Sequence, residues 1–430
     1  MDHIKVLDNL YLVINICLYL IAIIVCYRRY GYMNIGGACL VLYLSIAVVS
    51  LHLYNTSTFE FDFERLTLFP FLYLFGMLLM ALSSLLKFDE RAVTFEQPTA
   101  MRSFYALCVV GVLATLFYFI SSLSSLQLNL ASLFVDSGGA DLYADSMEDS
   151  EDVGVGVDNL MSIISNLCSD VMILALFYVM TFKSPKKWLI VGIIVSVALS
   201  LIMSLSEGLR GQVVLSLLTI LFTYYLFRYR LPQRAKRIAK IVMIVVGVLA
   251  IVPVAFITFS RFDNHQSMDV AESIEWYYGQ SFLNFNNYGL DAGGIRYGDR
   301  TANFFKSFLF DDVPHNFVER REKYSHLKID DYYFYTFVGD FTIDYGPILA
   351  VLLFIIFTVI FVKKTRADNN RLHFHQLLML YFVLCVCVQG SFYLFSYSDV
   401  GGNLKMIFML MLYVYFKLDY MRANGILKWK

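Results

Sequence analysis

The feature of this sequence that most limits its fold is a series of apolar runs, each about as long as a lipid bilayer is thick. A helix needs roughly 20 mostly apolar residues to cross a hydrocarbon core of about 30 Å. Hydrophobic residues make up 58% of the 430-residue chain and charged residues only 16%, which is unlike a soluble globular protein. The apolar runs are therefore expected to be the spanning helices of an integral membrane protein.

Eleven runs have the length of a membrane span. They predict an all-α polytopic membrane protein, folded as a single integral membrane domain over residues 1–430. No basic region or small-residue cleavage pattern precedes the first run, so we expect it to remain as a helix. The predicted spans are residues 9–27, 32–52, 66–86, 104–122, 159–182, 188–206, 211–227, 241–259, 338–362, 374–396 and 402–420.

Basic residues are distributed unevenly between the two sides of these spans. Loops rich in Lys and Arg are retained on the cytoplasmic side of a membrane. The uneven distribution therefore predicts an N-terminus outside and a C-terminus in the cytoplasm. The basic groups on the cytoplasmic side lie at residues 28–29, 87–102, 183–187, 228–240, 363–371 and 417–430.

Two long segments then face the exterior. Residues 123–158 are acidic, rich in small residues and free of Lys and Arg, a composition that cannot bury a core and predicts a flexible surface loop. Residues 260–337 are rich in both aromatic and charged residues. We expect this second segment to fold against the membrane and to form part of the active site.

The aromatic residues of the second segment allow two interpretations. Phe304, Phe305, Phe308 and Phe310 are expected to form the buried side of a helix lying along the bilayer surface. Other aromatic rings have polar rims and flat faces, which suit a ligand with apolar ring faces such as a sugar. The candidate sugar-contacting residues are Trp276, Tyr277, Tyr278, Tyr288, Tyr297 and Asp344.

The stretch LSEGLRGQVV places Glu207 and Arg210 between two predicted spans. Residues 188–227 number about forty, which two crossings require in full, so both charges should lie at the exterior edge of the hydrocarbon. In one interpretation Arg210 reaches toward water and pairs with Glu207. In the other, Arg210 grips phosphate oxygens with its planar guanidinium, while Gly208 lets a head group approach the backbone.

The stretch FVGDFTIDYGPI contains a second pair of charges. Asp340 and Asp344 are four residues apart, so a helix would place them on one face. Residues 348–362 are too few for a full span, so we expect their helix to begin several residues earlier and Asp344 to lie near the interface. A carboxylate there is a candidate general base, or a partner for Arg210 or Arg261.

Other catalytic groups are few. His315 is the histidine of the exterior segment and a candidate base or substrate contact. All seven cysteines fall in predicted spans, which excludes disulfides between the exterior segments. Motifs for nucleotide binding, serine hydrolysis and zinc chemistry are absent from the sequence, so we expect no metal, no cofactor and no nucleic acid partner.

The layout of spans, the SEGLRGQVV hairpin, the long exterior segment and TFVGDFTIDYGPI resemble those of the O-antigen polymerases, the Wzy-type oligosaccharide repeat-unit polymerases. The resemblance implies an inverting, metal-independent glycosyltransferase of the GT-C class in a bacterial inner membrane. It would join undecaprenyl-diphosphate-linked oligosaccharides on the outer face, amid membrane lipids and with a chain-length regulator as a candidate partner. Some members have an exterior Arg and a Gly separated by ten intervening residues, and in this chain Lys328 and Gly339 have that spacing.

The resemblance also implies roles for particular residues. Exterior arginines hold the diphosphate, and the candidates here are Arg210, Arg261, Arg296 and Arg300. Asp340, Glu207 or His315 would take the proton of an acceptor hydroxyl. Three alternatives remain: a lipid-linked sugar transporter or flippase, a ligase that transfers finished polymer, and a non-catalytic scaffold for envelope assembly.

Overall fold

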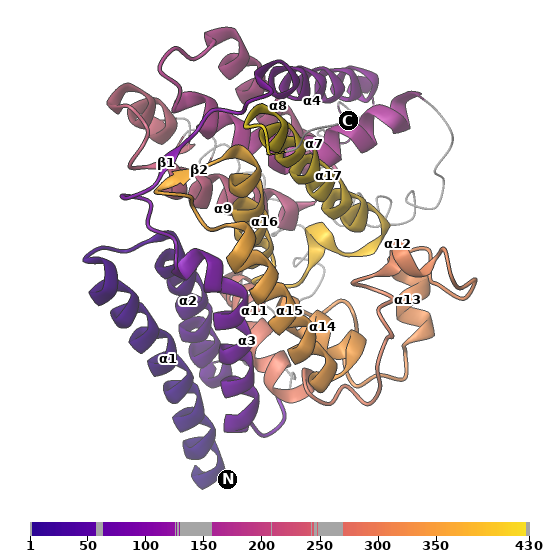
Figure 1. Ribbon diagram of the computed structural model, residues 1–430. Coiled ribbons are helices and arrows are strands. Elements are labelled where there is room, and N and C mark those ends of the chain that lie inside the picture. The colour runs from indigo at the N-terminus through magenta and orange to yellow at the C-terminus, as the bar shows by residue number, and fades with distance from the viewer. Residues whose placement is uncertain are drawn as a thin grey trace. The chain divides into compact units, whose positions relative to one another are not determined.

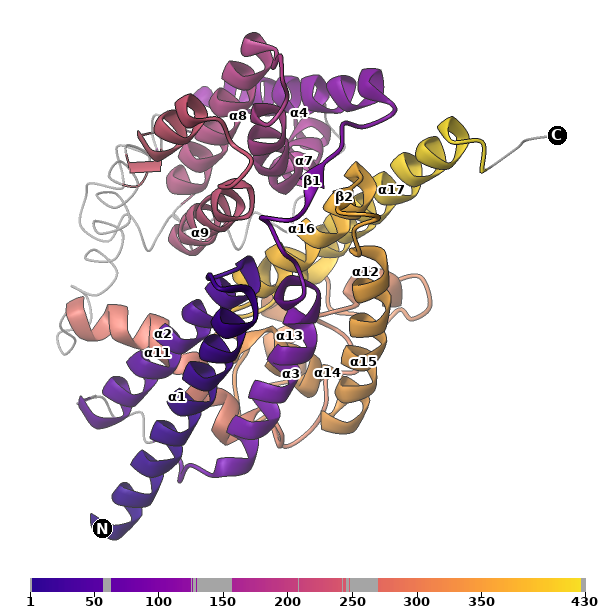
Figure 2. The same cartoon turned by 60° about the vertical axis from the view of Figure 1, so that its left-hand side comes forward.

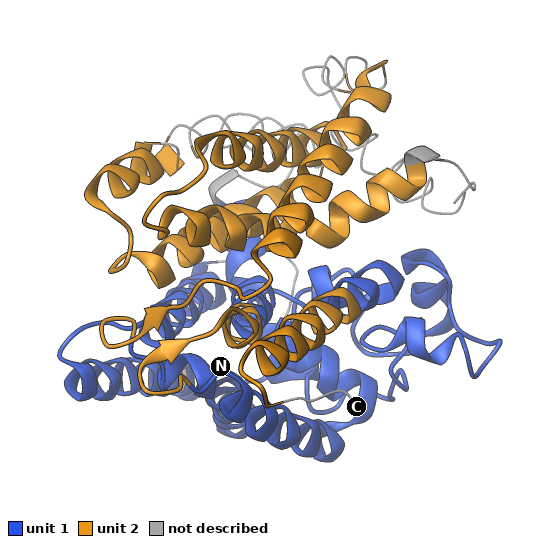
Figure 3. Ribbon diagram, turned by 45° about the horizontal axis from the view of Figure 1, so that its top comes forward, with its two compact units in different colours: residues 1–89, 267–366, 382–406 blue, residues 90–266, 367–381, 407–430 orange. Residues whose placement is uncertain are grey.

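The computed structural model describes residues 2–56, 63–124, 126, 129, 157–207, 209–241, 243, 244, 247 and 270–426. Most of the predicted acidic loop at 123–158 and most of the predicted span at 241–259 lie outside these residues. The chain groups into two compact units (Figure 3). Unit 1 contains Met1–Asp89, Ser267–Arg366 and Phe382–Met406, and unit 2 contains Glu90–Gln266, Ala367–Tyr381 and Ile407–Lys430.

In the described part of the chain, eight helices are long and apolar enough to cross a membrane, which supports the prediction of an all-α polytopic membrane protein. They are α1 (Asp2–Tyr30), α2 (Ile35–Thr56), α3 (Leu68–Leu86), α4 (Met101–Ser121), α7 (Val157–Met180), α8 (Lys187–Ser206), α9 (Arg210–Phe227) and α15 (Pro347–Lys364). Two other predicted spans correspond to α16 (Phe374–Gln389), of 16 residues, and α17 (Asp399–Ala423).

In unit 1, helices α1, α2 and α3 pack side by side (Figures 1 and 2). Asn34 ties the start of α2 to the end of α3, because its side-chain amide donates to the carbonyl oxygens of Leu85, Leu86 and Phe88. A side chain at Gly36 would collide with the backbone of Leu86, so the close approach of the two helix ends requires glycine.

Helix α11 (Val270–Tyr288) lies within the predicted exterior segment and packs on α2, a candidate membrane span. The two helices meet at Gly279, where an added Cβ would lie about 3.1 Å from the Val49 side chain. The Ser50 hydroxyl donates to the Gly279 carbonyl at 2.6 Å. Small residues permit such close contact and hydroxyls add hydrogen bonds between helices. The first described element of the predicted exterior segment is thus a helix held on the bundle.

The predicted span at 338–362 is two helices rather than one. Helix α14 (Thr336–Tyr345) ends at Gly346, whose φ of 78° is in the left-handed region that favours glycine, and α15 begins at Pro347. Proline cannot continue a preceding helix but suits the first turn of a new one. The expectation that the helix after 348 begins several residues earlier is therefore wrong. Asp340 and Asp344 do share a helix, but it is the separate α14.

The rest of the exterior segment is mostly irregular. It contains α12 (Asn303–Lys306) and α13 (Phe317–Lys323). A short 3-10 helix, η2 (Phe395–Tyr397), lies later in the chain and precedes α17. The expected surface helix through Phe304–Phe310 is wrong in length, since α12 has four residues and ends at Lys306. The Phe308 and Phe310 side chains are largely exposed, at 72% and 59%.

In unit 2, helices α4, α7 and α8 pack together. Hydroxyl groups link all three, since Thr115 lies 2.9 Å from Ser165 and accepts from Ser196 at 3.0 Å. Strands β1 (Thr94–Phe95) and β2 (Arg371–Leu372) form a short parallel pair. None of the seven cysteines, all of which lie in the described part of the chain, forms a disulfide.

Candidate functional site

A buried cluster of charges in unit 1 joins the exterior segment to α14. Helix α14 supplies Asp340 and Asp344, whose side chains are fully buried. The loop between α11 and α12 supplies Arg296 and Arg300, which are 1% and 2% exposed. The two carboxylates of the FVGDFTIDYGPI stretch therefore pair with Arg296 and Arg300, whereas the sequence suggested Arg210 or Arg261 as a partner.

Each carboxylate of α14 is held from both sides. Arg296 Nε lies 2.7 Å from Asp344 Oδ1, and Arg300 Nε lies 3.1 Å from Asp340 Oδ1. The other oxygen of Asp344 accepts from the backbone N–H and the hydroxyl of Thr301, both at 2.7 Å. The other oxygen of Asp340 accepts from the backbone N–H of Leu394 at 2.6 Å. These contacts offset the cost of burying charge.

Asp331 is the centre of the cluster, and sequence reasoning missed it. Its carboxylate forms ion pairs with Arg296, Arg300 and Arg320. The Tyr335 hydroxyl accepts from Arg296 at 2.9 Å and from Arg300 at 2.6 Å, and it donates to Asp331 at 3.1 Å. Burial disfavours charge on Asp331, but the three guanidinium groups outweigh burial and hold the pKa of this carboxyl well below its usual range.

Arg320 completes the cluster from α13. It is 1% exposed and pairs with both Asp331 and Asp399, the first residue of α17. Three arginines therefore face four aspartates, namely Asp331, Asp340, Asp344 and Asp399. The sequence does not predict that Arg320 is buried, because the run ERREK resembles an ordinary solvated charge run.

The backbone is strained where the cluster meets the helices. Thr336 has a φ of 65° and Asp399 a φ of 57°, and a β-branched residue is rare in that region. Backbone hydrogen bonds hold this turn, since Thr336 donates to Phe392 at 2.6 Å and Phe337 donates to Gly390 at 2.8 Å. Such strain persists only where the surroundings fix the chain, and it is frequent at functional sites.

The hairpin with Glu207 and Arg210 belongs to unit 2. Helix α8 ends at Ser206 and α9 begins at Arg210, so three residues connect two candidate spans, as the length of the apolar runs predicted. Tyr118 donates a hydrogen bond of 3.1 Å to the Glu207 carboxylate. Burial raises the pKa of Glu207 above its ordinary value, although the Tyr118 hydrogen bond opposes this. Gly208 lies outside the described residues.

The other predicted site residues lie apart from the charge cluster or contact protein groups. Trp276 packs against Phe63 and Tyr333, and the Tyr278 hydroxyl lies 2.7 Å from Ser45. Tyr288 is partly buried beside the hydrophobic core of the exterior segment. His315 is exposed, and its backbone N–H donates to Glu319. Arg261 lies outside the described residues.

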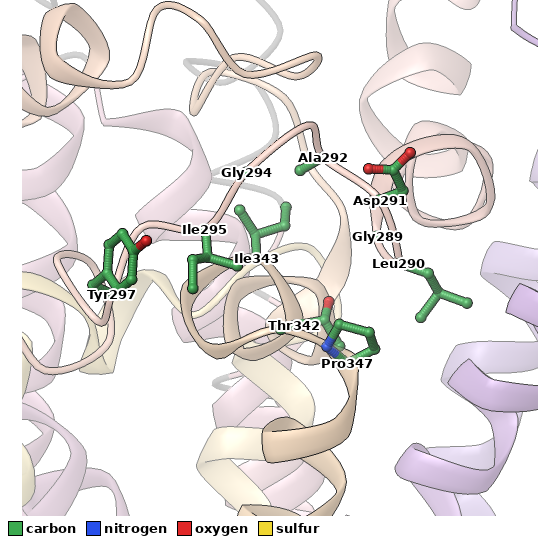
Figure 4. Close-up of a pocket in the computed structure, with 11 residues that line it drawn as sticks. Gly289, Leu290, Asp291, Ala292, Gly294, Ile295, Tyr297, Thr342, Ile343 and Pro347 are labelled. Carbon is green, nitrogen blue, oxygen red and sulfur yellow. The ribbon is translucent and has the colours of Figure 1, made fainter.

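A pocket of about 300 Å³ lies beside α14 (Figure 4). One wall is the loop from Gly289 to Tyr297, and the other is the junction of α14 and α15 at Thr342–Pro347. In the described residues, no three His, Cys, Asp or Glu side chains group as metal ligands do.

The fold and the charge cluster define a multi-pass helical membrane protein in which buried ion pairs hold the segment predicted to be exterior. The profile of the O-antigen polysaccharide polymerase Wzy family matches residues 4–310, which are 307 of the 430 residues, and the chain belongs to this family. The match includes Glu207, Arg210, Arg296 and Arg300, and it ends before Asp340. Neither the curated proteins nor the solved structures contain a match.

Membership confirms the resemblance seen in the sequence. The chain is therefore a membrane-embedded polymerase of the glycosyltransferase type, acting on lipid-linked oligosaccharide repeat units.

Proposed function

We propose that this protein polymerises undecaprenyl-diphosphate-linked oligosaccharide repeat units on the exterior face of a bacterial inner membrane, with its N-terminus outside and its C-terminus in the cytoplasm. The observation that carries the proposal is the family match over residues 4–310. The product would be a surface polysaccharide such as O-antigen, capsule or exopolysaccharide. A chain-length regulator is a proposed protein partner, and the GT-C class is the proposed fold class.

The proposed reaction is an inverting displacement at an anomeric carbon, without a metal. The acceptor hydroxyl oxygen attacks C1 of the donor sugar, and the bond between C1 and the diphosphate oxygen breaks. The diphosphate leaves with the bonding electrons, and a protein carboxylate takes the hydroxyl proton. Fixed cations accelerate this step if they bind the departing charge more strongly in the transition state than in the ground state.

The geometry favours the hairpin as the centre of this chemistry. Arg210 and Glu207 are both partly exposed at the junction of two candidate spans. Arg210 would bind the diphosphate, which its forked guanidinium suits. Glu207 would be the base, since a carboxylate whose pKa is raised by burial accepts a proton more readily near neutral pH. His315 is exposed and remains the alternative base.

This proposal does not use the expected diphosphate ligands Arg296 and Arg300, or the expected base Asp340, in the chemical step. Their side chains are nearly or fully enclosed, and each is already paired with an opposite charge. A diphosphate would have to displace Asp331, Asp340 or Asp344 to reach the two arginines. We therefore assign these residues to holding the exterior segment in its active shape.

Reconstitution with the native lipid-linked repeat unit tests the proposal. Wild-type protein in liposomes should produce a ladder of polymer on a gel, and addition of a chelator should leave it unchanged. Arg210→Ala should abolish the ladder, and Arg210→Lys should restore little of it, because Lys keeps the charge but not the fork. Arg65→Ala, an exposed arginine on the same predicted side, is the matched control.

The outcomes separate the alternatives. A wild-type ladder that persists in Arg210→Ala would refute the role of the hairpin. Folded wild-type protein that forms no ladder but moves the repeat unit across the bilayer would identify a transporter. Transfer of finished polymer to another acceptor, without chain growth, would identify a ligase.

A further inference from the structure

The pocket beside α14 has the features of a carbohydrate subsite. Its lining combines residues 289–292, Gly294, Ile295 and Tyr297 with Thr342, Ile343, Gly346 and Pro347. Its volume of about 300 Å³ is at the lower end for ligand pockets, which suits one or two sugar rings rather than a whole repeat unit. None of the residues expected from the sequence to contact sugar, apart from Tyr297, lines it.

We propose that this pocket binds a sugar ring of the growing or incoming oligosaccharide, and that the ring stacks on Tyr297. This inference rests on the proposed function. The Tyr297 side chain is 67% exposed, although it lines the pocket, and its backbone has a φ of 53°. A bulky residue is unfavourable in that conformation. Packing in a core does not explain why a tyrosine ring is held exposed at this strained backbone position. Binding of a sugar does explain it, because an aromatic face binds the C–H face of a sugar ring.

The remaining lining favours a neutral polyhydroxyl ligand over a phosphate or a lipid tail. Asp291 and Tyr297 lie at opposite ends of the pocket, and Thr342 lies between them (Figure 4). The Asp291 carboxylate accepts hydrogen bonds from sugar hydroxyls, and the residues that line the pocket include no Lys or Arg to bind a phosphate. Lys328 forms a hydrogen bond of 2.5 Å with Asp291 and lowers the pKa of its carboxyl, which keeps it an acceptor.

The pocket is preformed and linked to the charge cluster. The Arg296 backbone N–H donates to the Ile343 carbonyl at 3.0 Å, which joins the two walls. The Lys328 backbone N–H donates to the Ala292 carbonyl at 2.9 Å, which fixes the outer part of the loop. Since Arg296 also pairs with Asp344, the ion pairs that shape the exterior segment also set the width of the pocket. Preformed walls lower the ordering cost of binding.

Binding of the free oligosaccharide tests the subsite without requiring turnover. The probe is the reducing oligosaccharide released from the lipid-linked repeat unit by mild acid, titrated by calorimetry into protein in nanodiscs. Tyr297→Asn should weaken binding roughly five- to tenfold, the size of one aromatic contact. Asn tolerates positive φ, so this variant should fold. Tyr297→Phe should bind within about twofold of wild type, and Tyr332→Asn, an exposed tyrosine outside the pocket, should not change binding.

Asp291→Asn is a second variant, at a largely exposed side chain, and should also weaken binding. In the polymerisation assay, Tyr297→Asn should raise KM with little change in kcat. Binding by Tyr297→Asn and Asp291→Asn equal to wild type would overturn the subsite. If wild-type protein binds the oligosaccharide in a Tyr297-dependent way but makes no polymer, the subsite stands and the proposed polymerase function fails.

Discussion

At the scale of single residues, the exterior segment depends on one carboxylate that contacts three guanidinium groups. Asp331 pairs with Arg296, Arg300 and Arg320, all of which are nearly inaccessible to solvent. Removing one partner of a buried ion pair is costly, because the remaining charge stays buried without compensation. Asp330, its neighbour, pairs with Arg321 where both side chains are partly exposed. The two adjacent aspartates therefore provide a matched comparison of buried and exposed ion pairs.

Asp331→Asn should lower the free energy of unfolding by about 3–5 kcal/mol, whereas Asp330→Asn should cost less than about 1 kcal/mol. Thermal unfolding of both variants in detergent micelles measures the difference. Because the folded-state pKa of Asp331 is lowered, its stabilising contribution is present above the ordinary pKa and is lost as the pH falls below about 4. Equal melting temperatures for the two variants would contradict the central role of Asp331.

Glu207 should make stability and activity depend on pH in opposite directions. Its folded-state pKa is raised, so its contribution to stability is present below the ordinary value of 4.5 and is lost as the pH rises through the folded-state pKa. A base acts only when deprotonated, so activity should rise over the same interval. Initial rates and melting temperatures from about pH 4 to about pH 8 measure both trends.

Glu207→Gln should flatten this part of the stability profile and abolish polymer formation. Glu64→Gln, an exposed glutamate before α3, is the control and should leave both profiles unchanged. A Glu207→Gln variant with the wild-type rate profile would transfer the role of base to another group, of which His315 is the first to test.

At the scale of secondary-structure elements, the break between α14 and α15 separates the charge cluster from a membrane span. Gly346 has a φ of 78°, and its carbonyl accepts the backbone hydrogen bond of Ala350 at 3.1 Å. An added Cβ would meet Ile295 at 3.9 Å, which is an ordinary contact. Any cost of a side chain at this position therefore arises from the backbone conformation alone.

Gly346→Ala should destabilise the protein by about 1–2 kcal/mol, the cost of the left-handed conformation for a residue with a Cβ. Gly401→Ala offers the contrast, since Gly401 lies in α17 without positive φ and with open space around its Cβ position. That change should be neutral or stabilise by about 0.5–1 kcal/mol. Melting temperatures of the two variants check the prediction, and a stabilised Gly346→Ala variant would show that the turn is not strained for alanine.

At the scale of the whole molecule, the sequence predicted the apolar helices well, because bilayer thickness fixes their length. The predicted span 188–206 is α8 (Lys187–Ser206), and 211–227 is α9 (Arg210–Phe227). Helix α11 was missed, since its polar residues give no membrane signal and its packing on α2 depends on contacts distant in sequence. Of the buried cluster, the sequence indicated Arg296, Arg300 and the two aspartates of α14.

Arg320, Asp331 and Asp399 could not be predicted in the same way. Each lies in a stretch of ordinary polar composition, and what distinguishes them is their mutual contact: Arg320 is buried and pairs with Asp331 and Asp399, whose side chains are 7% and 45% exposed. Burial of a charge follows from tertiary contacts, which a local pattern does not contain.

The proposed orientation can be measured by cysteine labelling. Ser325→Cys and Asn369→Cys place single thiols at exposed positions in the exterior segment and in the loop between α15 and α16. The background replaces Cys17, the exposed native cysteine, with Ser. A membrane-impermeant maleimide should label position 325 in intact spheroplasts, and position 369 only after lysis. The reverse pattern would invert the proposed topology.

The contacts of α17 also constrain the order in which the protein can mature. Two residues of α17 contact the predicted exterior segment, since Asp399 pairs with Arg320 and Asn403 accepts from the backbone N–H of Phe304. The exterior segment is synthesised before any of these partners, and chains fold as they emerge. The segment therefore completes these contacts only after α17 has been synthesised. A chain that stops before α17 would leave the buried Arg320 without Asp399, so a missing or misplaced α17 should be felt directly in the shape of this distant segment.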